Sequence, residues 1–289
     1  MRLILLTALT MCAFAGNSVL NRLALKGQAI DALDFAAIRL AAGAVVLVIL
    51  SRVLGRRLEL GGAARLAGAA MLLTYMLGFS LAYRALDAGV GALILFGGVQ
   101  VTMFAGALWQ GETVPARRWA GAAMAFGGLV WLLWPTDGSA VEARLWPQLS
   151  MAAAAVGWGV YSLLGRRGGD PLAATTANFL LAAPLAALLA LLVPAGDAAI
   201  ALTGRGVALA LISGGVTSGL GYALWYGLLP QLGASRAGVA QLTVPVIALL
   251  GGMALLGEVP TARFLGAALL VLAGVAVATL RLSWRRAAA

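Results

Sequence analysis

Stretches of about 20 apolar residues recur from one end of the chain to the other, and they limit its fold more than any other feature. An α-helix needs about 20 residues to cross the hydrocarbon core of a bilayer, where it satisfies its backbone hydrogen bonds internally. The fold class predicted is therefore an all-α integral membrane protein with ten transmembrane helices. The expected spans are 2–23, 32–54, 64–86, 89–110, 116–134, 147–165, 172–194, 206–229, 234–256 and 261–281.

The composition excludes an ordinary soluble domain. Of the 289 residues, 62% are hydrophobic and 10% are charged, whereas soluble domains carry about 25% charged residues. The net charge of +10 would also suit a nucleic-acid-binding protein. The basic residues are scattered singly or in pairs between apolar runs, however, so we interpret them as signals of membrane orientation.

Lys and Arg are distributed unequally between the two sides of this layout. The loops and ends on the side of both termini hold thirteen of them, the other side holds six, and Arg39 lies within the second span. The six are Arg22, Lys26, Arg84, Arg144, Arg205 and Arg263. The positive-inside rule then places both termini in the cytoplasm. The first run is interpreted as a span and not as a cleaved signal, because its apolar stretch continues past Ala15 to Leu20.

Two parts of the chain resemble each other. Residues 111–117 contain Gly-Glu followed by Val-Pro-Ala-Arg, and residues 257–263 contain Gly-Glu followed by Val-Pro-Thr-Ala-Arg. Five helices in each half is an odd number, so the halves would face opposite ways, as in many transporters. We therefore expect two inverted five-helix repeats, 1–140 and 141–289. Chance similarity between Ala-, Gly- and Leu-rich helices is the alternative.

These features resemble a known family. They are the Gly-Glu ends of the fourth and ninth runs, the Gly-rich helix after each, Trp158 with Tyr161, and Pro245. Together they are similar to the EamA type of the drug/metabolite transporter superfamily, and within it to the aromatic amino acid exporters. The resemblance implies ten helices, export of amino acids or other metabolites, and a place in the bacterial inner membrane. One departure is Gly97-Gly98 in the fourth run, where family members often have a proline.

Polar and aromatic side chains within the spans are the candidates for substrate binding. Polar groups in a bilayer are costly and usually face the interior of a bundle, and buried aromatic rings can form a cavity wall with polar tips. The alternatives are interhelical hydrogen bonds for the amides and plain packing for the rings. The candidate substrate-binding residues are Asn17, Asn21, Tyr75, Phe79, Gln100, Trp158, Tyr161, Tyr222, Trp225 and Gln241.

Arg39 is the one charge well inside a predicted span. We expect its side chain to snorkel towards the outer interface. The alternative is that it meets an anionic group, such as the carboxylate of a substrate.

Catalytic and metal sites find little support in the sequence. The chain has no histidine and a single cysteine, Cys12, which argues against a Ser-His-Asp or Cys-His arrangement and a Cys/His metal site. We expect no enzyme activity, no catalytic residues, no metal and no cofactor. No predicted span carries a central Asp or Glu, so transport is expected to be facilitative or weakly ion-coupled.

The predicted function is export of amino acids, aromatic ones favoured, or of related small metabolites by alternating access. A drug or nucleotide-sugar transporter of the same fold is the alternative within transport, and a non-transporting membrane scaffold or binding protein is the alternative outside it. The expected partners are a small-molecule substrate and the lipid bilayer, with no nucleic acid, and a monomer is compatible with the pattern.

Overall fold

The protein is described here by a computed structural model that covers residues 1–111, 113–134, 141–165, 169–193, 200 and 202–279. Within those ranges it consists of helices and their connections, with no strand. The helices are α1 (Arg2–Lys26), α2 (Ala32–Val53), α3 (Ala63–Tyr83), α4 (Ala88–Trp109), α5 (Ala116–Leu133), α6 (Val141–Gly165), α7 (Pro171–Leu192), α8 (Gly204–Ile212), the π-helical segment η1 (Ser213–Leu220), α9 (Gly221–Gln241), α10 (Thr243–Leu256) and α11 (Ala262–Thr279).

Local sequence explains where several helices begin and end. The Asp31 carboxylate accepts a hydrogen bond from the Leu33 backbone N–H and so caps α2, and Asp170 caps α7 in the same way, with Pro171 directly after it. These side chains satisfy backbone donors that have no partner within the helix. Gly257, directly after the C-terminal residue of α10, adopts a left-handed conformation with φ of 65°, which glycine tolerates without strain.

Eight segments of the described chain are helices long and apolar enough to cross a membrane. They are Arg2–Lys26, Ala32–Val53, Ala63–Tyr83, Ala88–Trp109, Pro171–Leu192, Gly204–Leu232, Val239–Leu256 and Ala262–Thr279. α5 and α6 are helical at the predicted places but are not among these eight. The chain is therefore a multi-pass helical membrane protein.

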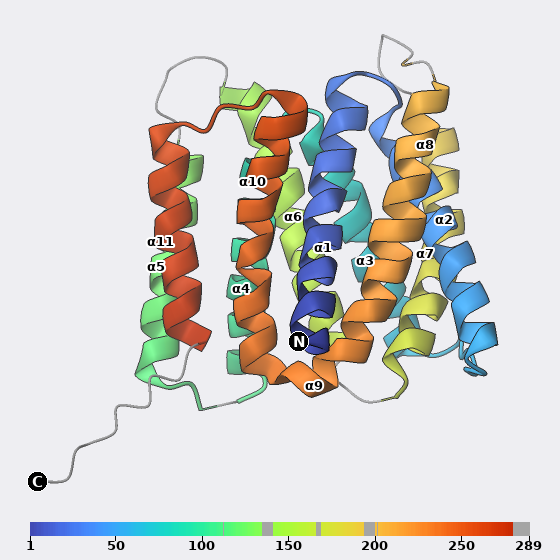
Figure 1. The fold of residues 1–289 in the computed structure, drawn as a ribbon, viewed down its shortest axis with the longest axis horizontal. Helices are drawn as coiled ribbons and strands as arrows, with labels where there is room; N and C mark the ends of the chain where they lie inside the picture. Colours follow the sequence, from blue (N-terminus) through green and yellow to red (C-terminus); the bar gives the residue numbers. More distant parts are fainter. Residues whose placement is uncertain (112, 135–140, 166–168, 194–199, 201, 280–289) are drawn as a thin grey trace, which may run out of the picture.

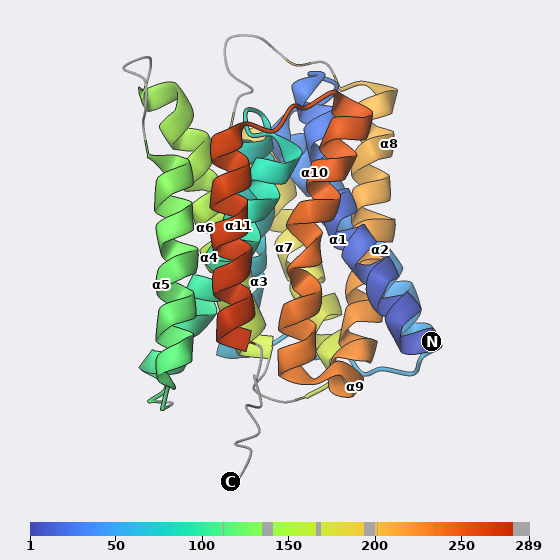
Figure 2. The same cartoon turned by 60° about the vertical axis from the view of Figure 1, so that its left-hand side comes forward.

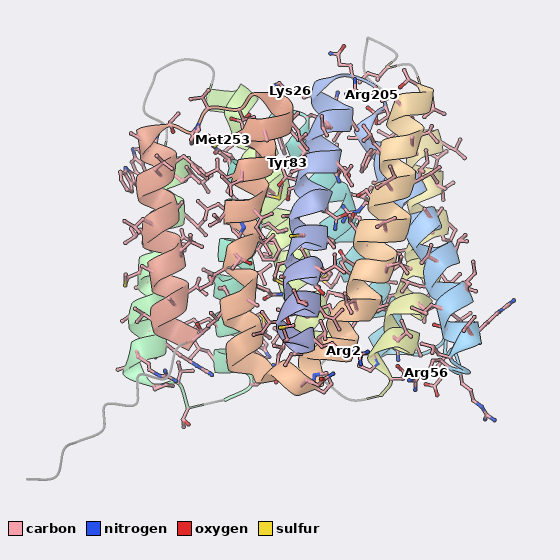
Figure 3. The ribbon with its side chains drawn as sticks, in the orientation of Figure 1. Arg2, Lys26, Arg56, Tyr83, Arg205 and Met253 are labelled. Carbon is pink, nitrogen blue, oxygen red and sulfur yellow. The ribbon has the colours of Figure 1, made fainter. Side chains whose placement is uncertain are left out.

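The helices stand side by side in one bundle, and α1 begins at the same end of the bundle at which α11 ends (Figures 1 and 2). The packing partners are α2 with α7, α3 with α6, α5 with α11, α4 with both α6 and α10, and α1 with α10 and with α8, η1 and α9. Charged side chains mark the two ends: Lys26 and Arg205 lie at one end, and Arg2 and Arg56 at the other (Figure 3).

Glycines allow two helix pairs to approach closely. A Cβ atom on Gly214 of η1 would overlap the backbone oxygen of Arg39 in α2 and lie 2.8 Å from the Cβ of Ala42. In the same way, Gly121 of α5 and Gly274 of α11 each leave room for the other's backbone oxygen. Small residues at such crossings let helix backbones come together in a membrane. The contact at Gly214 brings η1 against α2, next to Arg39.

The largest difference from the predicted helices lies between the eighth and ninth spans. α9 continues to Gln241, and α10 begins at Thr243 after a break at Leu242. The ninth span of the structure, Val239–Leu256, begins five residues later than the predicted 234 and still contains Gln241, which is the last residue of α9 directly before the break. Pro245 lies in the first turn of α10, where its missing N–H costs no helical hydrogen bond.

Some expectations concern residues outside the described ranges. The proposed boundary between the halves directly follows residues 135–140, which are not described. Glu112, the glutamate of the first Gly-Glu pair, also lies outside the described residues.

Candidate substrate-binding site

A small cavity lies in the interior of the bundle. Its lining comes from α1, α3, α4, α6 and α9. The lining residues are Phe14, Asn17, Tyr75, Phe79, Leu95, Phe96, Trp158 and Tyr222. Its free space is about that of a single water molecule, far below the roughly 300–1,000 Å³ of typical ligand pockets, so a solute would need the helices to move apart. Most of its wall is aromatic.

Trp158 is the centre of the aromatic wall. Its ring centroid lies 5.0 Å from that of Tyr75 and 5.1 Å from that of Tyr222. Tyr161, one helical turn further along α6, stacks on Trp158 with a centroid distance of 5.4 Å and an interplanar angle of 24°. Trp225 packs edge-on against Phe14 at 5.6 Å. Such offset and edge-to-face pairs stabilise the cluster by about 0.5–1.5 kcal/mol each beyond burial.

The two tyrosines from α3 and α9 meet through their hydroxyl groups. The Tyr222 hydroxyl donates to the Tyr75 hydroxyl over 3.3 Å. Both tyrosines are substrate-binding candidates in the sequence, and in the structure they meet at one site.

Asn17 is the polar centre of the cavity. Its side-chain oxygen Oδ1 accepts hydrogen bonds from Ser213, Thr217 and Ser218 over 2.9, 2.6 and 3.2 Å. Its amide nitrogen Nδ2 lies 3.3 Å from the Thr217 backbone oxygen. All three donors belong to or adjoin one turn of η1, and π-helical turns are frequent at functional sites because they re-aim side chains.

Asn21 extends this network away from the cavity. Its Nδ2 donates to the Asn17 backbone oxygen over 2.9 Å, and its Oδ1 accepts from the Ser80 hydroxyl over 3.0 Å. The side chain is fully buried. In this conformation Asn21 is a hydrogen-bonded link between α1 and α3 and does not line the cavity.

Arg39 is fully buried, and the expectation that it snorkels to the outer interface is wrong. Its Nε donates to the Ser218 hydroxyl over 3.0 Å and its Nη2 to the Tyr75 hydroxyl over 3.2 Å. The guanidinium carbon lies 5.0 Å from the Phe79 ring centroid. The close crossing of η1 over α2 and the aromatic faces of α3 hold the side chain inside the bundle, where it has hydroxyl partners.

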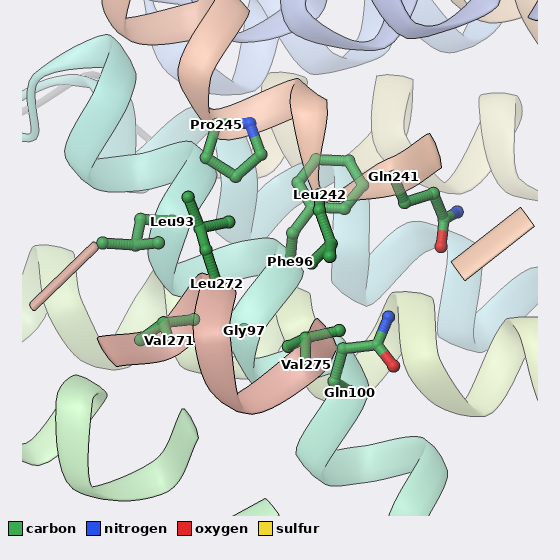
Figure 4. Close-up of a pocket in the computed structure, with 10 residues that line it drawn as sticks. All are labelled: Leu93, Phe96, Gly97, Gln100, Gln241, Leu242, Pro245, Val271, Leu272 and Val275. Atoms are coloured by element: carbon green, nitrogen blue, oxygen red, sulfur yellow. The ribbon is translucent and has the colours of Figure 1, made fainter. Parts of the chain in front are cut away.

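A second cavity, equally small, lies between α4, the α9–α10 break and α11. Gln100 and Gln241 extend into the same side of it, as Figure 4 shows. Phe96 lines this cavity and the central one. The two amides predicted for the site are therefore separated from the aromatic wall by one side chain.

An ion-paired cluster at one end of the bundle joins α1 to the α3–α4 connection and to the α10–α11 connection. Arg22 of α1 lies 3.2 Å from the Asp87 carboxylate and 3.3 Å from the Glu258 carboxylate, and it also donates to the backbone oxygens of Tyr83 and Arg84. The second Glu258 oxygen accepts the Ala88 backbone N–H over 2.8 Å. Burial raises the pKa of the Glu258 carboxyl above its usual 4.5, partly offset by the Ala88 N–H and by Arg22.

The predicted site residues thus fall into three groups. Asn17, Tyr75, Phe79, Trp158 and Tyr222 line the central cavity. Gln100 and Gln241 line the neighbouring one. Asn21, Tyr161 and Trp225 support the first group from behind.

Sequence reasoning missed Phe14, Leu95 and Phe96 in the central cavity. Phe14 had a usable signal, because it lies three residues before Asn17 and so on the same face of α1. It also missed the η1 hydroxyls on Asn17. Ser213, Thr217 and Ser218 have the helical spacing of one face, interrupting an otherwise apolar and Gly-rich run.

Within the described part of the chain, no group of three or more His, Cys, Asp or Glu residues is close enough to hold a metal ion. The chemistry that the site offers is hydrogen bonding, aromatic contact and one buried positive charge.

Comparisons with known proteins agree with this architecture. Residues 145–280 match the model of the EamA-like transporter family. An uncharacterized protein of Pseudomonas aeruginosa is 48% identical over 276 residues, which is 96% of this chain and 94% of that protein. A solved crystal structure with 22% sequence identity superposes with a TM-score of 0.64, covering 94% of this chain and 97% of that chain, and this likeness concerns the fold alone.

Proposed function

Residues 145–280 form an EamA-like transporter family domain, and from this premise we propose that the chain exports aromatic amino acids or related small metabolites across the bacterial inner membrane. Transport would proceed by alternating access and be facilitative or only weakly ion-coupled. The positions of two carboxylates support weak or absent ion coupling: Glu258 and Asp87 lie at the end of the bundle and not within the central cavity.

One observation carries the proposal. Side chains from α1, α3, α4, α6 and α9, which come from both halves of the sequence, converge on one interior cavity. Its wall is mainly aromatic, and Asn17 and the Tyr75 and Tyr222 hydroxyls supply polar groups. An amphipathic solute with an aromatic ring has the chemistry to match such a wall.

The packing of the helices supports two inverted five-helix repeats. Exchange of the halves would relate α1 to α6, α2 to α7, α3 to the α8–η1–α9 rod, α4 to α10 and α5 to α11. Under this exchange the packed pair α3–α6 corresponds to α1 with the α8–η1–α9 rod, and the packed pair α4–α6 corresponds to α10 with α1. Both corresponding pairs are packed as well. The pairs α2–α7, α4–α10 and α5–α11 are unchanged by it and are packed too. Substrate sites of inverted-repeat transporters lie at the interface of the repeats near the midplane, which suits the central cavity.

The orientation with both termini in the cytoplasm is part of the proposal. The end of the bundle with Arg2 and Arg56 would be cytoplasmic, and the end with Lys26 and Arg205 would be periplasmic (Figure 3). The excess of Lys and Arg on the side of the termini supports this orientation.

Counterflow in proteoliposomes tests the function. The purified protein is expected to exchange labelled phenylalanine, tyrosine or tryptophan, and Trp158→Ala and Tyr222→Ala to lower this flux about tenfold, equivalent to about 1.4 kcal/mol. Trp146→Ala is the matched control, because Trp146 lies on the same helix as Trp158 but is exposed on the surface of the bundle. Flux is compared per amount of folded protein, measured by size-exclusion chromatography.

The panel also includes sugars, a nucleotide sugar and cationic drugs. Flux of one of these without flux of amino acids would replace the proposed substrate class. Absence of flux for every compound would favour a scaffold or binding protein instead.

A further inference from the structure

Arg39 is a charged side chain in an unusual place. It lies seven residues after the start of α2, about 10 Å along the helix, and no part of it is exposed. Charged residues within membrane helices are costly and are retained where they serve a pathway or a binding site.

The guanidinium group has more donors than partners. Five N–H groups are available, and the described residues supply two acceptors, Ser218 and Tyr75. The Nη1 nitrogen is buried without a hydrogen-bond partner. None of the described carboxylates forms an ion pair with Arg39.

Both partners of Arg39 connect it to the central cavity. Tyr75 lines the cavity, and Ser218 donates its hydrogen bond to Asn17, which lines it as well. Phe79, whose ring lies under the guanidinium, is also part of the cavity wall. The charge is therefore directly behind the wall formed by Tyr75 and Phe79, and movement of the Tyr75 hydroxyl would open it to a ligand.

We propose that Arg39 binds the carboxylate of the substrate, while an apolar or aromatic part of the same molecule packs against Phe14, Trp158 and Tyr222. This inference rests on the proposed function, because it names the substrate chemistry of the same site. A planar guanidinium fork matches a carboxylate. With one cation at the site, a monoanion neutralises the charge, and the ligand class is an amphipathic monocarboxylate, with or without an amino group.

The test uses thermal unfolding of the purified full-length protein in detergent, which does not depend on transport. The probes are 3-phenylpropionate, its uncharged amide and phenethylamine, at equal concentrations and constant ionic strength. A ligand that binds the folded state raises Tm. We expect 3-phenylpropionate to raise Tm by several degrees and the amide and amine to leave it unchanged.

Arg39→Gln is expected to abolish the shift caused by 3-phenylpropionate, and Arg39→Lys, which keeps the charge but loses the fork, to reduce it. Arg52→Gln is the matched control: Arg52 lies on the same helix, is exposed, and its loss should leave the shift intact. Equal shifts for the acid and its amide in the unaltered protein would overturn the proposal, as would an equal shift with inorganic phosphate. The first comparison needs no variant, so it remains decisive if Arg39→Gln does not fold.

The outcome is separable from that of the counterflow experiment. A carboxylate-specific shift without flux would refute transport and leave the Arg39 site standing. Flux of aromatic amino acids together with no preference for the carboxylate would leave transport standing and refute the role of Arg39.

Discussion

Arg22 and Arg39 are both buried in this bundle, but their surroundings differ. Arg22 has two carboxylates and two backbone oxygens within hydrogen-bonding distance. Arg39 has two hydroxyl partners and one nitrogen without any. Burying a charge next to an opposite charge and with all donors satisfied costs far less than burying it alone. The protein itself supplies Arg22 with counter-charges and acceptors, whereas Arg39 has no counter-charge among the described residues and keeps one nitrogen without an acceptor beside a cavity.

The positions of the two residues fit this difference. Arg22 joins α1 to the end of α3, the start of α4 and the connection between α10 and α11, so its ion pairs hold these elements together at one end of the bundle. Arg39 lies on α2, inside the bundle, where it contacts α3 and η1. Four predictions test this difference.

Arg22→Ala should have the largest effect on stability. It leaves the buried Glu258 carboxylate, whose side chain is 4% exposed, without its cation, and such a loss costs about 3–5 kcal/mol. Asp87 contributes little, because 48% of its side chain is exposed. The free energy of unfolding in detergent is the measurement, and Arg22→Ala combined with Glu258→Gln should recover a large part of the loss.

The same variant should depend on pH. Burial raises the pKa of Glu258, so its protonated form is favoured by folding, and this contribution is present at low pH and is lost as the pH rises through the raised pKa. Without Arg22 the pKa rises further. The destabilisation caused by Arg22→Ala should therefore be smaller near pH 5 than near pH 8, and a pH-independent loss would mean that Glu258 is not the orphaned charge.

Arg39→Met should behave in the opposite way. No carboxylate loses a partner, and replacement of a buried charge by an apolar side chain is often neutral or stabilising. We expect Tm to be unchanged or higher, with counterflow of aromatic amino acids about tenfold lower, equivalent to about 1.4 kcal/mol. A loss of stability as large as that of Arg22→Ala would show that Arg39 is a structural residue.

Tyr75→Phe should have the smallest effect overall, a loss of about 1 kcal/mol in stability, because it removes one hydroxyl that accepts from Arg39 and Tyr222. It should also change the preference for 3-phenylpropionate over its amide. Tyr161→Phe is the matched control, since its hydroxyl bonds to Thr175 and not to Arg39. Thermal unfolding with and without the two probes separates the cases, and identical preferences in both variants would remove Tyr75 from the carboxylate site.

The sequence predicts the helices and the aromatic faces well, for a physical reason. The apolar runs at 32–54 and 89–110 coincide within two residues with α2 and α4, because the thickness of the bilayer sets the length of a span. Tyr75 and Tyr222 are predicted because aromatic side chains with polar tips inside spans tend to face the interior of a bundle, where the two hydroxyls do meet.

Other features depend on which faces pack together, and a single sequence does not contain that information. Snorkelling is the reasonable expectation for Arg39, the eighth residue of its span. The close crossing at Gly214 and the rings of α3 hold the Arg39 side chain inside the bundle instead. The Arg22 cluster joins residues 236 positions apart in the chain. α9 continues through Pro230 and Gln231 to Gln241, although the sequence predicts a connection between the spans 206–229 and 234–256 at this place.

The account depends most on the claim that the interior cavity opens to water and takes a carboxylate. Leu95→Cys tests this directly, because Leu95 lines the cavity without belonging to the polar network, and Cys12, the one native cysteine, is replaced by serine. We predict that a membrane-impermeant thiol reagent modifies Cys at this position in proteoliposomes and that 3-phenylpropionate slows the modification. A cysteine in place of Ala182, buried in α7 away from the cavity, should stay unmodified. Absence of modification at position 95, or modification that the carboxylate does not slow, would contradict the account.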